Sequence, residues 1–200
     1  CGIDDTTVTT FATTALGRGM PVVLAPAMHE SMYRHPGVAE NLRRLRSWGI
    51  NIVGPKIEEG KAKIADNEVI VLHAERAVSD RPLAGKKVLI TSGPCAEPLD
   101  DVRVMTTRAT GRMGRALALE AFRLGAEVTV VHSDTFPCVR NIRVTTAAEM
   151  REGVLRICRN EGVDIYASAA AISDFAPERR EGKIPSGSPL TVRLNPLPKV

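Results

Sequence analysis

The sequence is poor in aromatic residues, which make up only 4% of its 200 positions, so that valine, isoleucine, leucine and alanine must fill the core. Its four cysteines form no C-x-x-C pair and no metal-ligand spacing with the four histidines, as expected of reduced cytosolic thiols. No apolar run is long enough to span a membrane. The net charge of +4 comes from basic residues interleaved with acidic ones. These absences predict a cytoplasmic globular protein that binds neither membranes nor nucleic acid, and they favour small phosphorylated substrates.

The first eighty residues carry alternating helix and strand signals. Val38, Leu42, Leu45 and Trp48 form one apolar stripe of a helix that Pro36 begins. Helices are predicted over 4–16, 36–48 and 69–77, and strands over 21–27 and 50–54. The segment 79–82, Ser-Asp-Arg-Pro, is the best candidate for a linker, which predicts one domain over 1–79 and another over 80–200.

After the linker the alternation begins again. Strands are predicted over 87–91, 127–131 and 164–168, and helices over 112–124 and from a capping box at 146–149 to residue 159. A loop followed by a β-hairpin is predicted for the segment after residue 172. This pattern predicts an α/β fold with a Rossmann-like, doubly wound, mostly parallel sheet, whose site lies at the carboxyl ends of the strands.

The stretch from Val88 to Ala126 is the most informative. A strand, KVLITSG, leads through the long loop PCAEPLDDVRVMTTRATG into the helix RMGRALALEAFRLGA. A helix N-terminus after a glycine-containing loop is suited to binding a polyanion. The loop is too long for a G-x-G-x-x-G dinucleotide turn, and it carries charges of its own, listed together here: Glu97, Asp100, Asp101, Arg103, Arg108 and Arg112. We interpret this as a nucleotide site that performs phosphate chemistry rather than one that holds NAD.

Three groups are expected at the strand ends, and each has a simpler structural alternative. Backbone N–H groups and Arg112 can hold a triphosphate, but a Gly-x-x-Gly helix start can also serve only close packing. Small residues at 168–171 let a flat base or a pantothenyl chain lie against the backbone. Asp174 follows the strand, where it is either a functional carboxylate or a turn residue. Lys183 lies on a predicted mobile, glycine-flanked loop, as a catalytic cation or a solvated charge.

The segment GKKVLITSGPCAEPLDDVRVMTTRATGRMGRALALEA resembles the phosphopantothenate–cysteine ligase family, and AAAISDF and GKIPSG resemble that family's later motifs in the same order. Upstream, PAMHESMY and EGKAKIAD resemble the C-terminal part of the flavodoxin-like, FMN-dependent phosphopantothenoylcysteine decarboxylase domain. Together they resemble the bifunctional coenzyme A biosynthesis family, in which decarboxylase precedes ligase. The histidine in PAMH is more typical of its archaeal members.

The resemblance implies that CTP or ATP, with Mg²⁺, activates 4'-phosphopantothenate as an acyl-nucleotidylate, which the amine of cysteine then attacks. It implies roles in nucleotide binding for Gly93, Thr110, Gly111, Arg112, Met113, Gly114, Ala170, Ala171 and Asp174. Lys183 is implied to stabilise charge on the reacting groups. Thr107 stands where the family has an asparagine linked to the acyl intermediate, which puts the step with cysteine in doubt. Arg112 replaces a family lysine.

For the decarboxylase half, the resemblance implies FMN as the cofactor and site roles for His29 and Met32. The family's reducing cysteine is absent, because Lys61, Ala62 and Lys63 occupy its segment. The other histidines, His35, His73 and His132, match no motif and are expected on the surface or in the core. A homo-oligomer is expected by resemblance alone.

Two further hypotheses stay open. A nicotinamide-dependent reductase lacks its glycine fingerprint here, but Asp134 follows the second strand as a ribose-binding carboxylate would. A non-catalytic nucleotide-binding subunit would account for Thr107 and the missing cysteine. The chain begins with Cys1 and ends in NPLPKV, so we expect a fragment cut at both termini.

Overall fold

The computed structural model describes residues 3–187 and 189–199. By its internal contacts the chain divides into unit 1, Cys1–Asp80, and unit 2, Arg81–Val200. The strands of unit 2 are β6 (Lys87–Pro94), β7 (Ala96–Pro98), β8 (Val104–Thr106), β9 (Glu127–His132), β10 (Arg140–Arg143), β11 (Ile165–Ala171), β12 (Phe175–Pro177) and β13 (Leu194–Pro196). Its helices are α5 (Arg112–Arg123) and α6 (Ala147–Asn160).

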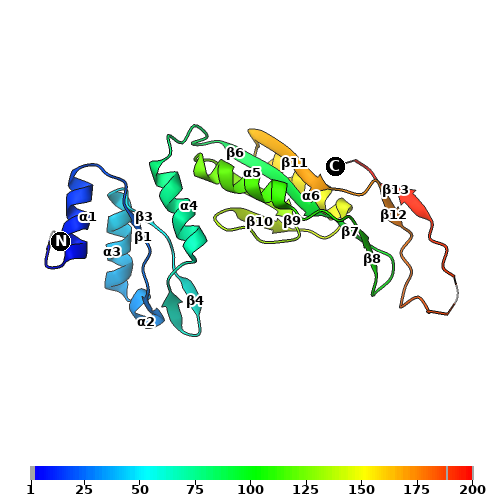
Figure 1. Ribbon diagram of the computed structural model, residues 1–200, viewed down its shortest axis with the longest axis horizontal. Coiled ribbons are helices and arrows are strands. Elements are labelled where there is room, and N and C mark those ends of the chain that lie inside the picture. Colours follow the sequence, from blue (N-terminus) through cyan, green and yellow to red (C-terminus); the bar gives the residue numbers. More distant parts are fainter. Residues whose placement is uncertain (1–2, 188, 200) are drawn as a thin grey trace. The chain divides into compact units, whose positions relative to one another are not determined.

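A four-stranded parallel sheet with the order β10-β9-β6-β11 organises unit 2 (Figure 1). The chain adds β9 and β10 on one side of β6 and then crosses back through α6 to place β11 on the other side. Residues 88–93 of β6 are all buried, as expected for a central strand covered on both faces. The predicted doubly wound, parallel α/β fold is confirmed.

Apolar side chains on alternate positions of the strands pack against the two helices. Leu89 and Val131 face α6, where Met150 and Val154 complete a cluster of buried residues. On the other face lies α5, which Figure 1 shows in front of the sheet with α6 behind it. Helix α6 begins with the predicted capping box, in which Glu149 N donates to Thr146 Oγ1 and Thr146 N donates to Glu149 Oε2.

Three features of unit 2 differ from the prediction. Strand β10 was not predicted, because four residues with two arginines carry little apolar signal. The long loop contains an antiparallel hairpin of β7 and β8, in which Glu97 pairs with Met105. The C-terminal hairpin is an antiparallel pair of β12 and β13 that encloses the loop of residues 178–193, whereas the loop was expected to precede the hairpin.

Unit 1 consists of four helices and short strands within its described residues. The helices are α1 (Thr7–Gly17), α2 (Glu30–Tyr33), α3 (Pro36–Ser47) and α4 (Asn67–Val78). The strands are β1 (Val23–Leu24), β2 (Met28–His29), β3 (Asn51–Ile52), β4 (Lys56–Glu58) and β5 (Lys61–Lys63). Strands β1 and β3 pair in parallel, and β2, β5 and β4 form an antiparallel sheet.

The three predicted helices of unit 1 are present, and both predicted strands are shorter than expected. The β4–β5 hairpin was missed, since its turn uses Glu59 with φ 52° before Gly60, and a glutamate gives no sign of a left-handed turn. No helix in the described part of the chain is long and apolar enough to cross a membrane.

Candidate functional site

The strand order of unit 2 reverses between β6 and β11, because β9 and β10 are added on one side of β6 and β11 on the other. Gly93 of β6 and Ala170 of β11 are paired in register there, followed by Pro94 and Ala171. In open α/β sheets, ligands bind in the crevice that forms where the order reverses, at the carboxyl ends of the strands. The fold thus brings together residues from two of the predicted groups that are 77 positions apart.

The N-terminus of α5 lies against this edge through two glycines with different tasks. Gly111 adopts φ 69° at the helix N-cap and supplies no side-chain cap, so the first-turn N–H groups need another partner. A Cβ on Gly114 would lie 2.2 Å from Ser92 Oγ, so Gly114 permits the close packing of α5 on β6. The close-packing alternative for the Gly-x-x-Gly pattern therefore applies to Gly114, while phosphate binding at Gly111 stays a prediction.

A pocket of about 250 Å³ opens between the carboxyl ends of β6 and β9 and the start of α5. Its lining is Ser92, Gly93, Pro94, Ala109, Thr110, Gly111, His132, Ser133, Asp134 and Phe136. It unites Gly93, Thr110 and Gly111 of the predicted nucleotide site. Asp134 of the reductase hypothesis lies in the same pocket, whereas Ala170, Ala171, Asp174 and Lys183 are not among its lining residues.

His132 lines the pocket, although it belongs to no motif that would mark it as a site residue. It is 1% exposed, and its Nε2 lies 2.8 Å from Asn141 Oδ1. The same oxygen accepts from Phe136 N, and Asn141 Nδ2 donates to the carbonyl oxygens of Phe136 and Val139, so the amide orientation is determined.

Because Asn141 Oδ1 is an acceptor, His132 carries its proton on Nε2 and presents a bare Nδ1. That Nδ1 is buried without a hydrogen-bond partner in the described residues. Burial lowers the pKa of His132 and so favours the neutral ring, although the hydrogen bond with Asn141 acts in the opposite direction. The pocket wall is therefore uncharged at this point, with a tilted Phe136 ring at 4.2 Å between ring centroids.

Several charged residues of the long loop have structural roles that the sequence did not predict. Glu97 Oε1 accepts from Ala147 N at 2.8 Å and so caps α6. The buried carboxylate of Asp100 accepts from the backbone N of Val102, Arg103 and Ile184, and from Arg103 Nη1 at 2.5 Å. Burial raises the pKa of Asp100, but these hydrogen bonds outweigh it and hold that pKa well below its usual range.

The predicted catalytic residues of unit 2, Thr107 and Lys183, are not among the lining residues of this pocket. Lys183 is exposed, and the residues on both sides of it are hydrogen-bonded to residues 99–103. These hydrogen bonds hold the loop, whereas a mobile loop was predicted. Thr107 Oγ1 accepts from Ala109 N at 3.4 Å in the approach to α5. The side chains of Arg112 and Met113 are exposed on the first turn of α5. Asp174 is exposed and forms an ion pair with Lys199.

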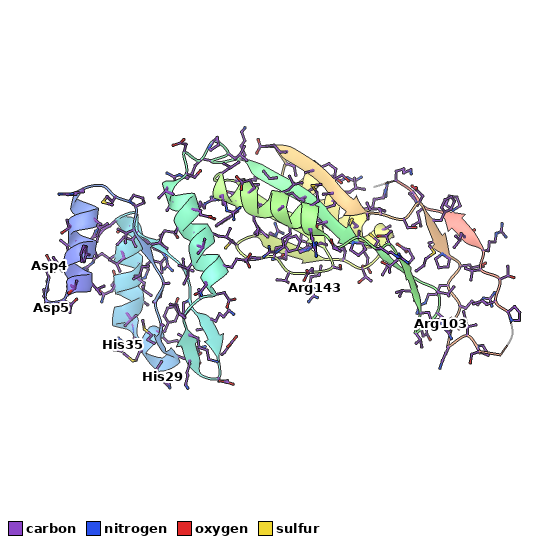
Figure 2. All side chains as sticks on the ribbon, viewed as in Figure 1. Asp4, Asp5, His29, His35, Arg103 and Arg143 are labelled. Carbon is purple, nitrogen blue, oxygen red and sulfur yellow. The ribbon has the colours of Figure 1, made fainter. Side chains whose placement is uncertain are left out.

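In unit 1, His29 and Met32 lie on β2 and α2. His29 Nδ1 caps α2 by accepting from Ser31 N at 3.4 Å, and His35 Nδ1 caps α3 in the same way at 3.1 Å (Figure 2). Met32 is 57% exposed. A flavin ring needs an enclosed apolar slot, and these two exposed side chains do not provide one, so we derive no step through a flavin.

His73 of unit 1 is half-buried. Its Nδ1 lies 3.1 Å from Asn51 Nδ2, and burial together with Arg76 lowers its pKa. Among the described residues, no group of three histidine, cysteine, aspartate or glutamate side chains is placed to hold a metal ion.

The fold and the pocket define unit 2 as a doubly wound α/β protein with a candidate ligand pocket at the carboxyl ends of β6 and β9. Residues 83–200 match the family described as DNA/pantothenate metabolism flavoprotein C-terminal domain, and residues 1–78 match the flavoprotein family. The chain belongs to the DNA/pantothenate metabolism flavoprotein family, as the motif resemblance predicted.

Curated relatives extend this result. The coenzyme A biosynthesis bifunctional protein CoaBC of Thermococcus kodakarensis is 43% identical over 204 residues, covering 100% of this chain and 50% of the relative. The CoaBC protein of Methanocaldococcus jannaschii is 36% identical over 204 residues, covering 100% of this chain and 49% of the relative. Both sources are archaeal, in agreement with the PAMH motif. The chain spans about half the length of the curated relatives it matches.

A solved structure supports the fold. The DNA/pantothenate metabolism flavoprotein from Streptococcus pneumoniae aligns with a TM-score of 0.51 at 20% identity, covering 58% of this chain and 62% of that chain. At this identity the likeness bears on the fold alone.

Proposed function

We propose that unit 2 is the nucleotide-binding part of a phosphopantothenate–cysteine ligase, and that unit 1 is the C-terminal part of the partner decarboxylase. The observation that carries the proposal is the uncapped N-terminus of α5 at the pocket of Gly93, Thr110 and Gly111. A triphosphate would accept from the free N–H groups there, in the favourable field of the helix dipole. Arg112 and the backbone of Met113 and Gly114 extend that donor set.

In the proposed reaction, a carboxylate oxygen of 4'-phosphopantothenate attacks the α-phosphorus of CTP or ATP. The new P–O bond forms as the α–β anhydride breaks and pyrophosphate leaves. The amine of cysteine then attacks the acyl carbon, the C–N bond forms, the nucleoside monophosphate leaves, and the amine proton passes to solvent. Lys183 neutralises charge that develops on the reacting oxygens, and the backbone near Ala170, Ala171 and Asp174 contacts the nucleoside.

Two positions qualify the proposal. Thr107 offers one hydroxyl in place of the family asparagine, so capture by cysteine is expected to be the slower half-reaction. Magnesium would arrive on the triphosphate, because the described residues hold no cluster of three ligands. The proposed decarboxylase half, with FMN as its cofactor, is supported by the flavoprotein match of residues 1–78, and the roles of His29 and Met32 in it rest on the motif resemblance. A cytoplasmic homo-oligomer is part of the same proposal.

The decisive experiment follows pyrophosphate release by the full-length protein with phosphopantothenate, CTP or ATP, with and without cysteine. Turnover that needs phosphopantothenate and yields phosphopantothenoylcysteine supports the ligase and identifies its nucleotide. A single burst that cysteine cannot relieve places the defect at Thr107. Binding of CTP with no release at all favours the non-catalytic subunit.

A matched pair of variants tests Lys183. Lys183→Ala is expected to lower pyrophosphate release by roughly a hundredfold, the size of a lost transition-state charge contact. Arg180→Ala removes an exposed cation from the same loop while its backbone N–H bond to Leu99 O remains, so it serves as the control. Equal effects of the two changes would contradict a specific role for Lys183.

A nicotinamide-dependent reductase is the second candidate, because Asp134 lines the pocket just beyond β9. A carboxylate at this point hydrogen-bonds the ribose in dinucleotide-binding sheets. The hairpin of β7 and β8 replaces the short glycine turn that such cofactors need. Tight NADH binding, abolished by Asp134→Ala, would favour this candidate over the ligase.

A further inference from the structure

Residues 99–103, at the turn between β7 and β8, contact the segment that carries Lys183. Asp101 Oδ2 accepts from Gly182 N at 3.0 Å, and Asp100 Oδ2 accepts from Ile184 N at 3.1 Å. Gly182 and Ile184 are the two neighbours of Lys183. The N–H groups of both neighbours of the lysine are therefore held by adjacent carboxylates.

The backbone carbonyls of the same two neighbours are held as well. Asp101 N donates to Gly182 O at 3.3 Å, and Arg103 Nη1 donates to Ile184 O at 3.2 Å. Figure 2 shows Arg103 at the β8 end of this turn. Each neighbour of Lys183 thus uses both of its backbone polar groups on one short turn, which determines the direction in which the lysine side chain leaves the backbone.

The anchoring turn differs in burial between its two carboxylates. The side chain of Asp100 is 0% exposed and pairs with Arg103, whereas that of Asp101 is 49% exposed and pairs with Arg179 at 3.1 Å. A buried, fully hydrogen-bonded carboxylate is costly to alter, while the exposed one can be changed without opening the core. Asp101 is therefore the informative position.

We propose that Asp101, together with Asp100, is a positioning residue that holds the backbone on both sides of Lys183 and so sets the direction of its side chain. This inference rests on the proposed function of Lys183. It gives the unusually long connection between β6 and α5 a purpose: one end of that connection forms the pocket at Ala109–Gly111, and its middle holds the catalytic cation. The phosphate end of the site and Lys183 then belong to one hydrogen-bonded element.

The test compares Asp101→Ala with Asp101→Asn in the full-length protein. Loss of the acceptor for Gly182 N–H should lower kcat by roughly tenfold, with little change in the KM for nucleotide, because Lys183 acts on charge that develops in the transition state. The asparagine retains an oxygen acceptor for Gly182 N–H and should restore most of kcat. An equal decrease in kcat in both variants, or an increase in KM with no change in kcat, would overturn the proposal.

Asp164→Ala is the matched control. Asp164 also accepts one backbone N–H, from Lys87 at 2.8 Å, and pairs with one lysine, Lys86, at 3.3 Å, but it lies at the amino end of β11. It should alter thermal stability about as much as Asp101→Ala and leave kcat unchanged. If both variants reduce kcat alike, the effect of Asp101 is structural and the proposal is wrong.

A double-mutant cycle with Lys183→Ala separates this inference from the proposed function. If Asp101 acts through Lys183, adding Asp101→Ala to Lys183→Ala should lower kcat no further. Additive losses would refute the coupling while leaving the ligase intact. If the wild-type protein shows no ligase turnover, hydrogen exchange at Gly182 and Ile184 decides the structural part: both amides should be protected in wild type, and Gly182 should exchange faster in Asp101→Ala.

Discussion

The two units carry motifs of similar clarity but bury their helices very differently. Helices α5 and α6 of unit 2 each bury five residues, whereas α1 of unit 1 buries none and α3 and α4 bury one each. On α1, Val8 is 78% and Phe11 is 72% exposed. Unit 2 therefore supports its pocket with a core of its own, and unit 1 shows its motif residues on exposed, locally capped turns.

A recognisable sequence motif therefore does not by itself form a functional site. The PAMH motif and Met32 mark unit 1 as similar to a known family, yet His29 uses its Nδ1 to cap helix α2. In unit 2 the matching residues meet at one edge of a sheet because buried strands bring them there. Catalytic geometry needs side chains held by packing, and among the described residues unit 2 meets this requirement better than the motif residues of unit 1.

The largest expected contrast comes from side-chain truncation. Leu89 is 1% exposed between β6 and α6, so Leu89→Ala should destabilise unit 2 by about 2–5 kcal/mol. Phe11→Ala in unit 1 should change stability by less than about 0.5 kcal/mol, since the ring is largely exposed. Urea unfolding, followed by hydrogen exchange of peptides from each unit, measures both. Similar losses would mean that α1 packs more closely than its exposure indicates.

Added bulk at a glycine should give the next largest effect. Gly114→Ala places a Cβ 2.2 Å from Ser92 Oγ and 2.4 Å from Ser92 Cβ, and should cost about 1–3 kcal/mol and displace the start of α5. Nucleotide binding should weaken with it, as titration calorimetry can measure. Adding Ser92→Gly should recover part of the loss. In unit 1, Gly17→Ala meets nothing within 4 Å and should be neutral or slightly stabilising.

Both units contain a helix with a threonine capping box, which allows a matched comparison. Thr146→Ala should cost unit 2 about 1 kcal/mol, because α6 is packed into the core and its first turn cannot fray freely. Thr6→Ala removes the same kind of cap from α1 and should chiefly increase local exchange of its first turn. Thermal unfolding and site-resolved exchange report the two results. A global loss from Thr6→Ala would show that α1 is coupled to the rest of unit 1.

The smallest effect concerns pH. Burial lowers the pKa of His132 below its ordinary 6.5, so between those two values the unfolded chain binds a proton that the folded unit 2 does not. Stability should therefore decrease as the pH falls below about 6.5. His132→Gln, which keeps a donor for Asn141, should flatten that part of the profile. An unchanged slope would indicate that the ring titrates alike in both states.

The sequence predicted the parallel α/β architecture, most helices and strands of unit 2, and the meeting of Gly93 with Ala170 and Ala171. These features depend on periodic apolar residues and on glycines, which are legible without tertiary contacts. The roles of the individual site residues stay predictions. Asn141 and His132 were not selected, because their pairing joins a short polar strand to the end of β9 and no local pattern marks it.

The structural use of the loop carboxylates could not be predicted. Glu97, Asp100 and Asp101 accept from backbone amides that include those of residues 147, 184 and 182, respectively. A carboxylate that caps a distant helix and one that binds a ligand have the same sequence signature. Only the three-dimensional register of the β7–β8 hairpin distinguishes them.

The position of β11 has a consequence for synthesis on the ribosome. Strand β6 pairs on one side with β9, the nearer of its two partner strands in the sequence. On its other side it pairs with β11, which is synthesised much later, since Lys87 and Asp164 are 77 residues apart. A nascent chain that ends before residue 165 would present the backbone of β6, with its apolar residues Val88, Leu89 and Ile90, as an open edge. Such edges recruit strands from other chains. Translation pauses in this interval would therefore expose the protein to aggregation, and a chaperone that binds extended apolar segments would act most usefully there.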